Sequence, residues 1–247
     1  MRVAVLADVH ANLPALEAVR EDFEKEGIKS VWTLGDAVGY GADPFACLQM
    51  LADLEAVLIA GNHELAACDL AEANGFNTSA AQAIRWTRES LTPNTRGDLC
   101  ELPTNSSPHP GVFLFHGLPG NTTGYLRTLE TAQMVFDHLS DRDPRIRVAF
   151  FGHTHRPMIF THLAGRPVRM FEPGEDLILA PGRRYLINPG SVGQPRNGDP
   201  NAQYIIFDIE EGLISFRRVP YDINAAQERI LKAGLCPSLA ARLNQGI

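Results

Sequence analysis

The sequence predicts an α/β (α+β) protein in which two β-sheets are flanked by helices. Two observations support this prediction. In the first half of the 247-residue chain, short apolar runs alternate with helical patterns; in the second half, short apolar runs follow one another, joined by Gly, Pro and Asn turns. No linker, internal repeat or low-complexity tract separates the halves. We therefore expect residues 1–247 to form a single domain, with residues 221–247 as a C-terminal helical tail.

The first half contains apolar runs typical of buried strands and segments with helical periodicity. The expected strands cover residues 3–7, 30–34, 56–60, 112–115 and 147–151. The expected helices cover residues 13–26, 44–54, 79–91 and 131–139. Asn12 and Asp43 precede the first two helices and can serve as N-caps. Residues 103–110 contain Pro and Ser and are expected to form a loop.

The second half is mostly strand by the same criteria. The expected strands cover residues 158–163, 168–171, 177–179, 185–187, 204–208 and 214–219. The tail, residues 224–244, is expected to form two short helices broken near Gly234 and Pro237. We expect the apolar face of this tail to cover the protein's own sheet, with a dimer contact as the alternative.

The composition restricts the partners. The net charge is −7, so stable binding to duplex nucleic acid is not expected. A phosphate substrate remains compatible with this charge, because bound metal cations can reverse the local potential. The sequence has no run of 18 apolar residues and no signal-peptide pattern, so we expect a cytoplasmic protein without a membrane partner. The four scattered cysteines are expected to be reduced and to act as small apolar side chains.

The candidate chemistry lies where the apolar runs end. Each of five runs is followed by residues of metal-ligand type, which are Asp8-Val9-His10, Gly35-Asp36, Gly61-Asn62-His63-Glu64, His116-Gly117 and Gly152-His153-Thr154-His155. In α/β sheets, ligands bind outside the carboxyl ends of the strands, so these side chains are expected to meet. Five of the eight histidines lie in these turns, whereas His109, His138 and His162 are expected to be ordinary surface or core residues.

These residue types fit a centre with two metal ions. Two cations about 3.5–4 Å apart can bind both the attacking and the leaving oxygen of an in-line displacement. Such a pair needs a bridging anion, and the carboxylate of Asp36 can supply it. Imidazole and oxygen ligands without thiolate suit two divalent ions, with Mn²⁺ favoured and Fe, Zn or Ni as alternatives.

The ordered set of five motifs resembles that of the calcineurin-like metallophosphoesterase superfamily. Residues 35–44 (GDAVGYGADP) and 188–196 (NPGSVGQPR) are similar to its compact microbial phosphodiesterase branch, which has no large cap domain. The resemblance implies a four-layer αββα sandwich of two mixed β-sheets flanked by helices. It implies one metal held by Asp8, His10, Asp36 and His155, and a second held by Asp36, Asn62, His116 and His153. It also implies catalytic roles for His63 and Asp36, with His63 facing the substrate.

Two positions depart from the family pattern. Phosphoprotein phosphatases of the superfamily carry G-D-x-x-D-R-G after the second strand, whereas this chain has Gly39-Tyr40-Gly41 in place of the last Asp-Arg-Gly. The missing Asp-Arg pair favours a phosphodiester or nucleotide pyrophosphate over a phosphoprotein. Glu64 stands where Asp is usual, and we expect it to have a structural role.

Two further residues are candidate substrate contacts. Arg196 lies in a Gly/Pro loop that is either a plain turn or a segment in which this Arg binds a phosphate oxygen. Tyr40 follows Asp36 closely and either lines the pocket or packs in the interior. Arg156, directly after His155, is expected to be structural.

Together these features predict a phosphoesterase in which a metal-bridging hydroxide attacks phosphorus and His63 donates a proton to the leaving oxygen. A low-specificity phosphomonoesterase and a metal-binding scaffold with little turnover are the alternatives. The expected partner is a small phosphorylated substrate, with nucleotides among the candidates. The sequence leaves the oligomeric state open.

Overall fold

The computed structural model describes residues 1–174 and 176–247, which form two β-sheets with helices on both outer faces. One sheet has the strand order β2-β1-β10-β11-β8. Its strands are β1 Arg2–Leu6, β2 Ser30–Thr33, β8 Asp176–Ile178, β10 Ala202–Asp208 and β11 Leu213–Val219. The other sheet has the order β3-β4-β5-β9-β6-β7. Its strands are β3 Asn105–Ser106, β4 Val112–Phe115, β5 Val148–Phe151, β6 Met158–Leu163, β7 Arg169–Phe171 and β9 Arg183–Asn188.

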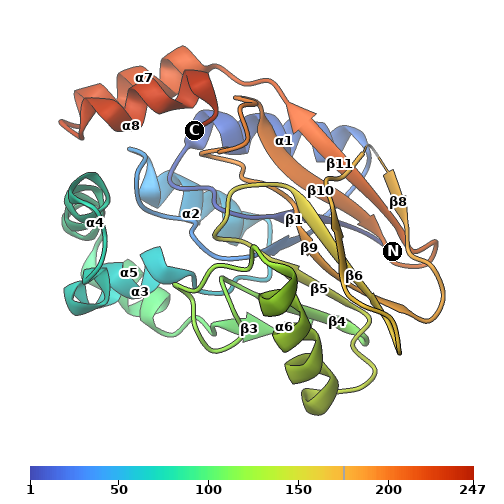
Figure 1. Cartoon of the computed structure of the whole chain (residues 1–247). Helices are drawn as coiled ribbons and strands as arrows, with labels where there is room; N and C mark the ends of the chain where they lie inside the picture. The colour runs from blue at the N-terminus through green and yellow to red at the C-terminus, as the bar shows by residue number, and fades with distance from the viewer. Residues whose placement is uncertain (175) are drawn as a thin grey trace.

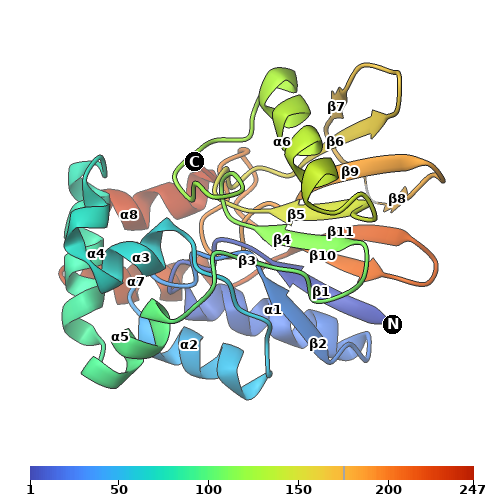
Figure 2. The same cartoon turned by 90° about the horizontal axis from the view of Figure 1, so that it is seen from below.

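Both sheets are mixed, as predicted. Strand β1 is parallel to β2 and antiparallel to β10, while β5 is parallel to β4 and to β9, and β6 is antiparallel to β9. Parallel pairs need crossover connections, and helices supply them in the first half of the chain. These helices are α1 Leu13–Lys25, α2 Pro44–Asp53, α3 Asn62–Cys68, α4 Thr78–Ser90, α5 Pro93–Cys100 and α6 Leu129–Arg142. Figure 2 shows α1 and α2 on one side of the paired sheets and α6 on the other.

Alternating side chains along the strands build this layered packing. In β1, Val3 and Val5 pack between the two sheets, whereas Leu6 belongs to a separate cluster with Leu16 and Phe23 of α1. The side chains of strand β5 alternate in the same way. One set packs between the two sheets, and the other set packs against α6. A strand with both faces buried is therefore apolar throughout, which explains the continuous apolar runs of the sequence.

Most predicted elements are present within one or two residues of their expected ends, with the exceptions that follow. Residues 56–60 do not form a strand: Val57 makes an isolated bridge with Trp32, and the chain then turns away, because the N–H of Ala60 bonds to the carbonyl of Pro103. Helices α3 and α5 and the two-residue strand β3 were not predicted. Helix α6 is longer than expected.

The tail forms α7 Ile223–Lys232 and α8 Pro237–Ala241, followed by a 3₁₀ turn, η2 Arg242–Gln245. A second 3₁₀ turn, η1 Leu70–Ala73, precedes α4. The tail was expected to cover the sheet, but Ile230, Leu235 and Leu239 pack instead with Ala83 of α4 and with Tyr40. Figure 1 shows α7 and α8 at one end of the sheets. The tail thus packs against Tyr40, in the loop after β2. In the described part of the chain, no helix has the length and apolar character to span a bilayer.

Candidate metal centre

The strand ends deliver the predicted residues to one edge of the structure. Asp8 and His10 follow β1, Asp36 follows β2, His116 follows β4, and His153 and His155 follow β5. Asn62 and His63 instead open helix α3. All eight of these side chains are buried, with His153 the most accessible at 8%. The structure therefore brings together every residue that the resemblance implied as a ligand, and His63 with them.

The backbone is unusual where these residues lie. Among the described residues, eight non-glycine positions have a positive φ, and six of them are site residues: Asp8, His10, Asp36, Tyr40, His153 and His155. Such a conformation costs on the order of 1–3 kcal/mol per residue and persists only where the surroundings enforce it. Concentration of this strain at one edge of the sheets is typical of a functional site, and nothing in the sequence pattern revealed it.

The first group consists of Asp8, His10, Asp36 and His155, whose candidate ligand atoms all lie within 4.8 Å of one another. Nε2 of His10 is 3.1 Å from Nε2 of His155 and 3.7 Å from Oδ2 of Asp36. Nε2 of His155 is 3.8 Å from Oδ1 of Asp8. Ligands bound at about 2.1 Å to one octahedral cation lie about 3 Å apart, so this group has the spacing of a metal site.

The second group consists of Asp36, His116 and His153, with the amide oxygen of Asn62 beside them. Nε2 of His116 lies 3.1 Å from Oδ1 of Asn62, 3.2 Å from Nδ1 of His153 and 3.3 Å from Oδ2 of Asp36. Asp36 belongs to both groups.

The histidine tautomers leave lone pairs pointing at one another. Nδ1 of His10 faces the carbonyl of Val38 at 3.1 Å, and Nδ1 of His155 faces the carbonyl of Gln194 at 2.6 Å. A carbonyl oxygen only accepts, so each Nδ1 carries the proton and each Nε2 of the neutral ring is unprotonated. These two Nε2 atoms face each other, and Oδ2 of Asp8 is buried without a hydrogen-bond partner in the described structure. A cation between these atoms resolves the repulsion, so the donor set fits a metal ion.

The second group has the same chemistry. Nδ1 of His116 donates to the carbonyl of Leu34 at 2.7 Å, which turns Nε2 toward the oxygens of Asn62 and Asp36. Such a bond from the non-ligating nitrogen to a carbonyl orients metal-binding imidazoles in general.

The pKa values reflect a cluster of ionisable groups that is buried away from water. Burial raises the pKa of Asp8 to about 7, against the opposing effect of His116. Burial would also raise the pKa of Asp36, but the charges of His116 and His63 outweigh it and hold this pKa well below its usual range. Burial lowers the pKa of His10 and His155 well below the usual histidine value. A divalent cation can balance the carboxylates and leave the imidazoles neutral, as metal coordination requires.

Glu64 fixes the loops around Asp36, in agreement with the structural role expected for it. Oε2 accepts from the backbone N–H of Asp36 at 2.8 Å and of Gly61 at 2.7 Å, and Oε1 accepts from Val38 at 3.1 Å. The Glu64 side chain is fully buried. It therefore joins the loop after β2 to the start of α3, which carries Asn62.

His63 lies beside both metal groups without belonging to either. Its backbone N–H donates to Oδ1 of Asp36 at 2.9 Å, and its ring lies between Tyr40 and Phe76, with centroid distances of 4.6 and 4.9 Å. Nδ1 is buried without a hydrogen-bond partner in the described structure, and a Cβ at Gly39 would meet it at 2.0 Å. Burial lowers the pKa of His63 to about 4, so the free protein holds this imidazole neutral at pH 7. A neutral ring can still donate a hydrogen bond, and a bound phosphate anion favours its protonation.

A cavity of about 310 Å³ opens over the centre, and both predicted substrate contacts line it. Tyr40 is buried against His10, with a centroid distance of 4.6 Å, so it packs in the interior and lines the pocket as well. Arg196 donates to Oε1 of Gln194 at 2.9 Å, and its Nε is buried without a partner in the described structure.

The sequence prediction missed two aromatic side chains that line this cavity. Tyr125 stacks on His153 with a centroid distance of 4.3 Å, and Phe76 contacts His63 from the loop before α4. Both residues lie in loops, where no periodic pattern marks them; the one available signal was that the loop of Tyr125 follows the site residue His116.

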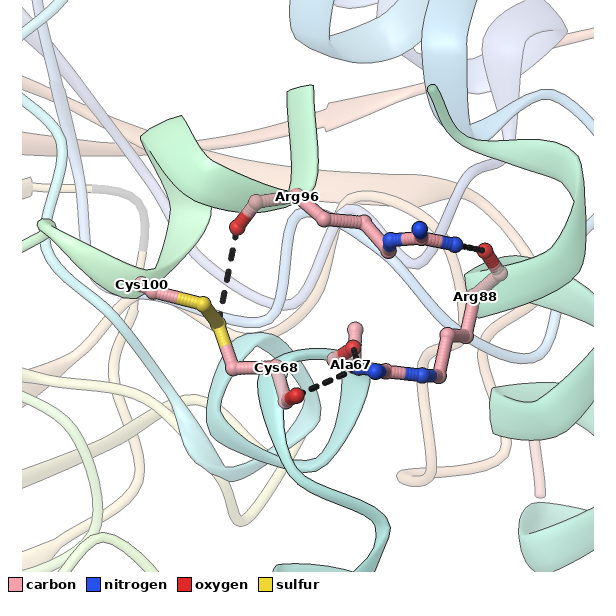
Figure 3. The surroundings of a disulfide bond; sticks show 5 residues. All are labelled: Ala67, Cys68, Arg88, Arg96 and Cys100. Atoms are coloured by element: carbon pink, nitrogen blue, oxygen red, sulfur yellow. Dashed lines mark hydrogen bonds between the residues drawn. A yellow bond between two sulfur atoms is a disulfide. The ribbon is translucent and has the colours of Figure 1, made fainter. Parts of the chain in front are cut away.

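A disulfide between Cys68 and Cys100 contradicts the expectation that all four cysteines are reduced (Figure 3). It joins the end of α3 to the end of α5, with the two Cα atoms 5.6 Å apart. Arg88 of α4 donates to the carbonyls of Ala67 and Cys68, and Arg96 of α5 donates to the carbonyl of Arg88 (Figure 3). The helix that begins with Asn62 and His63 is thus anchored at its far end. Cys47 and Cys236 are free thiols.

A sequence profile of the calcineurin-like phosphoesterase superfamily domain matches residues 1–212. The chain belongs to the calcineurin-like phosphoesterase superfamily. It is therefore a metal-dependent phosphoric ester hydrolase, and its His/Asp groups point to divalent ions as cofactors.

The chain is also similar to two relatives and to one further solved structure. The phosphoesterase chain is 35% identical over 260 residues to an uncharacterized protein of Methanocaldococcus jannaschii, covering 99% of this chain and 98% of that protein. It is 33% identical to a metallophosphoesterase from Sphaerobacter thermophilus, with a TM-score of 0.82 and full coverage of both chains. A hypothetical protein from Pyrococcus horikoshii OT3 has the same fold, with a TM-score of 0.80, 21% identity, and coverage of 100% of this chain and 98% of that protein. The predicted superfamily and four-layer fold are confirmed.

Proposed function

We propose that this phosphoesterase cleaves phosphodiester or nucleotide pyrophosphate bonds at a centre of two divalent metal ions. Asp8, His10, Asp36 and His155 hold one ion, and Asp36, Asn62, His116 and His153 hold the other. The observation that carries this proposal is the pair of buried donor groups with converging lone pairs that share Asp36. The N/O donor set favours Mn²⁺, with Fe, Zn or Ni as alternatives.

The bound cations would supply Lewis-acid stabilisation of phosphoryl charge and activation of water. The protein's own residues position the ligand atoms, bind the phosphate and assist the leaving group. Glu64 and the Nδ1–H donors keep the ligand atoms in place, so little reorganisation accompanies the reaction. Arg196 lines the cavity with an unpartnered Nε and binds a phosphoryl oxygen. His63 donates a proton or a hydrogen bond to the leaving oxygen, and the aromatic side chains around it limit access of bulk water.

The preference for diesters follows from the cationic side chains of the cavity. Among its described lining residues, Arg196 is the one arginine or lysine. At the position where phosphoprotein phosphatases carry a second Arg, this chain has Tyr40, which brings no positive charge to the cavity. A dianionic monoester gains more from an additional guanidinium than a monoanionic diester does.

Steady-state kinetics with one chromophore tests this proposal. With Mn²⁺ supplied, kcat/KM for bis(p-nitrophenyl) phosphate and for thymidine 5′-(p-nitrophenyl phosphate) should exceed that for p-nitrophenyl phosphate by about 10-fold or more, the size of one charged contact. Phosphoserine peptides should be poor substrates. Efficient hydrolysis of monoesters with negligible hydrolysis of both diesters would replace the proposal with a phosphomonoesterase.

A further inference from the structure

A second cavity, of about 650 Å³, adjoins the catalytic one and is lined by arginines. Four guanidinium groups lie in its walls, those of Arg127, Arg156, Arg196 and Arg218. Glu172 is the acidic side chain among its described lining residues. In a chain of net charge −7, this is a local concentration of positive charge.

The charges of this cavity are largely uncompensated. Arg218 pairs with Asp199 at 3.3 Å. In contrast, Arg127, Arg156 and Arg196 make no ion pair with any described residue, and the Arg156 guanidinium makes no hydrogen bond there either. Guanidinium groups without a carboxylate partner in a concave site are suited to oxyanions, which they bind through charge-assisted hydrogen bonds.

Two structural links connect this cavity to the catalytic one. Arg196 lines both. Arg127, which lines the second cavity, stacks over the ring of Tyr125 at 4.1 Å, and Tyr125 lines the catalytic cavity and contacts His153. A molecule whose scissile phosphate lies at the metal centre can therefore extend past Arg196 and Tyr125 into the arginine-lined cavity.

We propose that the arginine-lined cavity binds a second phosphate of the substrate, remote from the bond that is cleaved. This inference rests on the proposed function and narrows it: the preferred substrates are phosphodiesters or phosphate anhydrides that carry at least one further phosphate. Arg156 and Arg127 bind this remote phosphate, and Arg196 lies between it and the scissile phosphate.

A matched pair of substrates tests the proposal. Thymidine 5′-(p-nitrophenyl phosphate) and its 3′-phosphorylated form share the scissile bond and the leaving group and differ in the remote phosphate alone. In the wild-type enzyme, the 3′-phosphate should raise kcat/KM by about 10-fold or more, as expected for one or two charge-assisted contacts. In Arg156→Gln, the ratio of kcat/KM between the two esters should fall toward one.

The control is Arg145→Gln. Arg145 is 84% exposed, pairs with Asp143, and precedes β5 at the end opposite the metal centre. This variant should keep the wild-type ratio. A wild-type ratio near one, or an equal ratio in wild-type and Arg156→Gln, would overturn the inference and leave the proposed function intact.

Two further measurements separate the remaining outcomes. If the cavity binds free phosphate instead, inorganic phosphate will change hydrolysis of the single-phosphate ester in a way that Arg156→Gln abolishes, and that result overturns the assignment to substrate. If no diester is hydrolysed, the proposed function fails, and calorimetry tests the cavity by itself. Thymidine 3′,5′-bisphosphate should then bind more tightly than thymidine 5′-monophosphate in the wild type and not in Arg156→Gln; equal affinities in the wild type would contradict the inference.

Discussion

The backbone N–H of His63 donates a 2.9 Å hydrogen bond to Oδ1 of Asp36, the carboxylate common to both donor groups. The other oxygen, Oδ2, lies 3.7 Å from Nε2 of His10 and 3.3 Å from Nε2 of His116, one in each group. One carboxylate thus orients the start of α3 with one oxygen and faces both donor groups with the other. The position of the proposed proton donor is thereby coupled to that of the proposed bridging ligand.

Replacement of Asp36 by Asn should weaken both metal sites together, because it removes the bridging charge and retains the shape. We expect lower occupancy of both sites and a fall in kcat of about 10²–10³-fold or more. Elemental analysis of the purified variant measures the occupancy of both sites. The control variant is Asp137→Asn, on the exposed face of α6. Loss of one equivalent alone would show that Asp36 does not bridge.

His63→Ala should retain metal and lose activity in a way that depends on the leaving group. An alkoxide needs a proton and p-nitrophenolate does not, so we expect a loss of about 10²–10⁴-fold on alkyl or nucleoside diesters and a smaller loss on p-nitrophenyl diesters. The exposed His138 provides the control variant, His138→Ala, which should behave like the wild type. An equal loss on both leaving groups, with metal retained, would mean that His63 only positions the substrate.

Removal of the Glu64 carboxylate should destabilise the fold around the centre. In Glu64→Ala, the N–H groups of Asp36, Val38 and Gly61 lose their acceptor, at a cost of roughly 3–5 kcal/mol in the free energy of unfolding. Glu64→Gln keeps one carbonyl oxygen and should lose less. Urea unfolding of both variants measures this difference. An alanine variant as stable as the wild type would show that Glu64 does not fix the loops around Asp36.

The Cys68–Cys100 disulfide should contribute measurably to stability. It closes a loop with a sequence separation of 32 residues, for which chain entropy gives about 3–4 kcal/mol. Reduction or Cys100→Ser should therefore lower Tm, whereas Cys47→Ser tests for effects of thiol loss alone. Under denaturing, non-reducing conditions, thiol titration should find two free thiols; four would show that the disulfide is absent.

The sequence was most informative where apolar strands end in chemically distinctive residues. The motifs around Asp8, Asp36, His116 and His153 each follow a real strand, and the carboxyl ends of such strands meet by the geometry of the sheet. The site could therefore be assembled from local patterns. Of the two predicted caps, Asn12 is confirmed, because its side chain accepts from the N–H of Ala15. The cap predicted at Asp43 is wrong, because this side chain makes no cap bond and pairs with Arg229.

The remaining features depend on contacts between distant segments. Residues 56–60 have a strand pattern, yet the bond between Ala60 and Pro103 ends the pairing with β2 after one bridge. Cys68 and Cys100 become neighbours only because α3 packs against α5, which no spacing rule indicates. The cytoplasmic location and the single-domain organisation stay predictions.

Metal stoichiometry tests the central claim most directly. Protein purified without chelator and with Mn²⁺ supplied should contain close to two equivalents of metal per chain by elemental analysis. Exhaustive chelation should abolish hydrolysis of bis(p-nitrophenyl) phosphate, and readdition of Mn²⁺ should restore it as the second equivalent binds. Undiminished turnover by protein verified to be metal-free, or full activity with a single equivalent, would contradict the two-metal account.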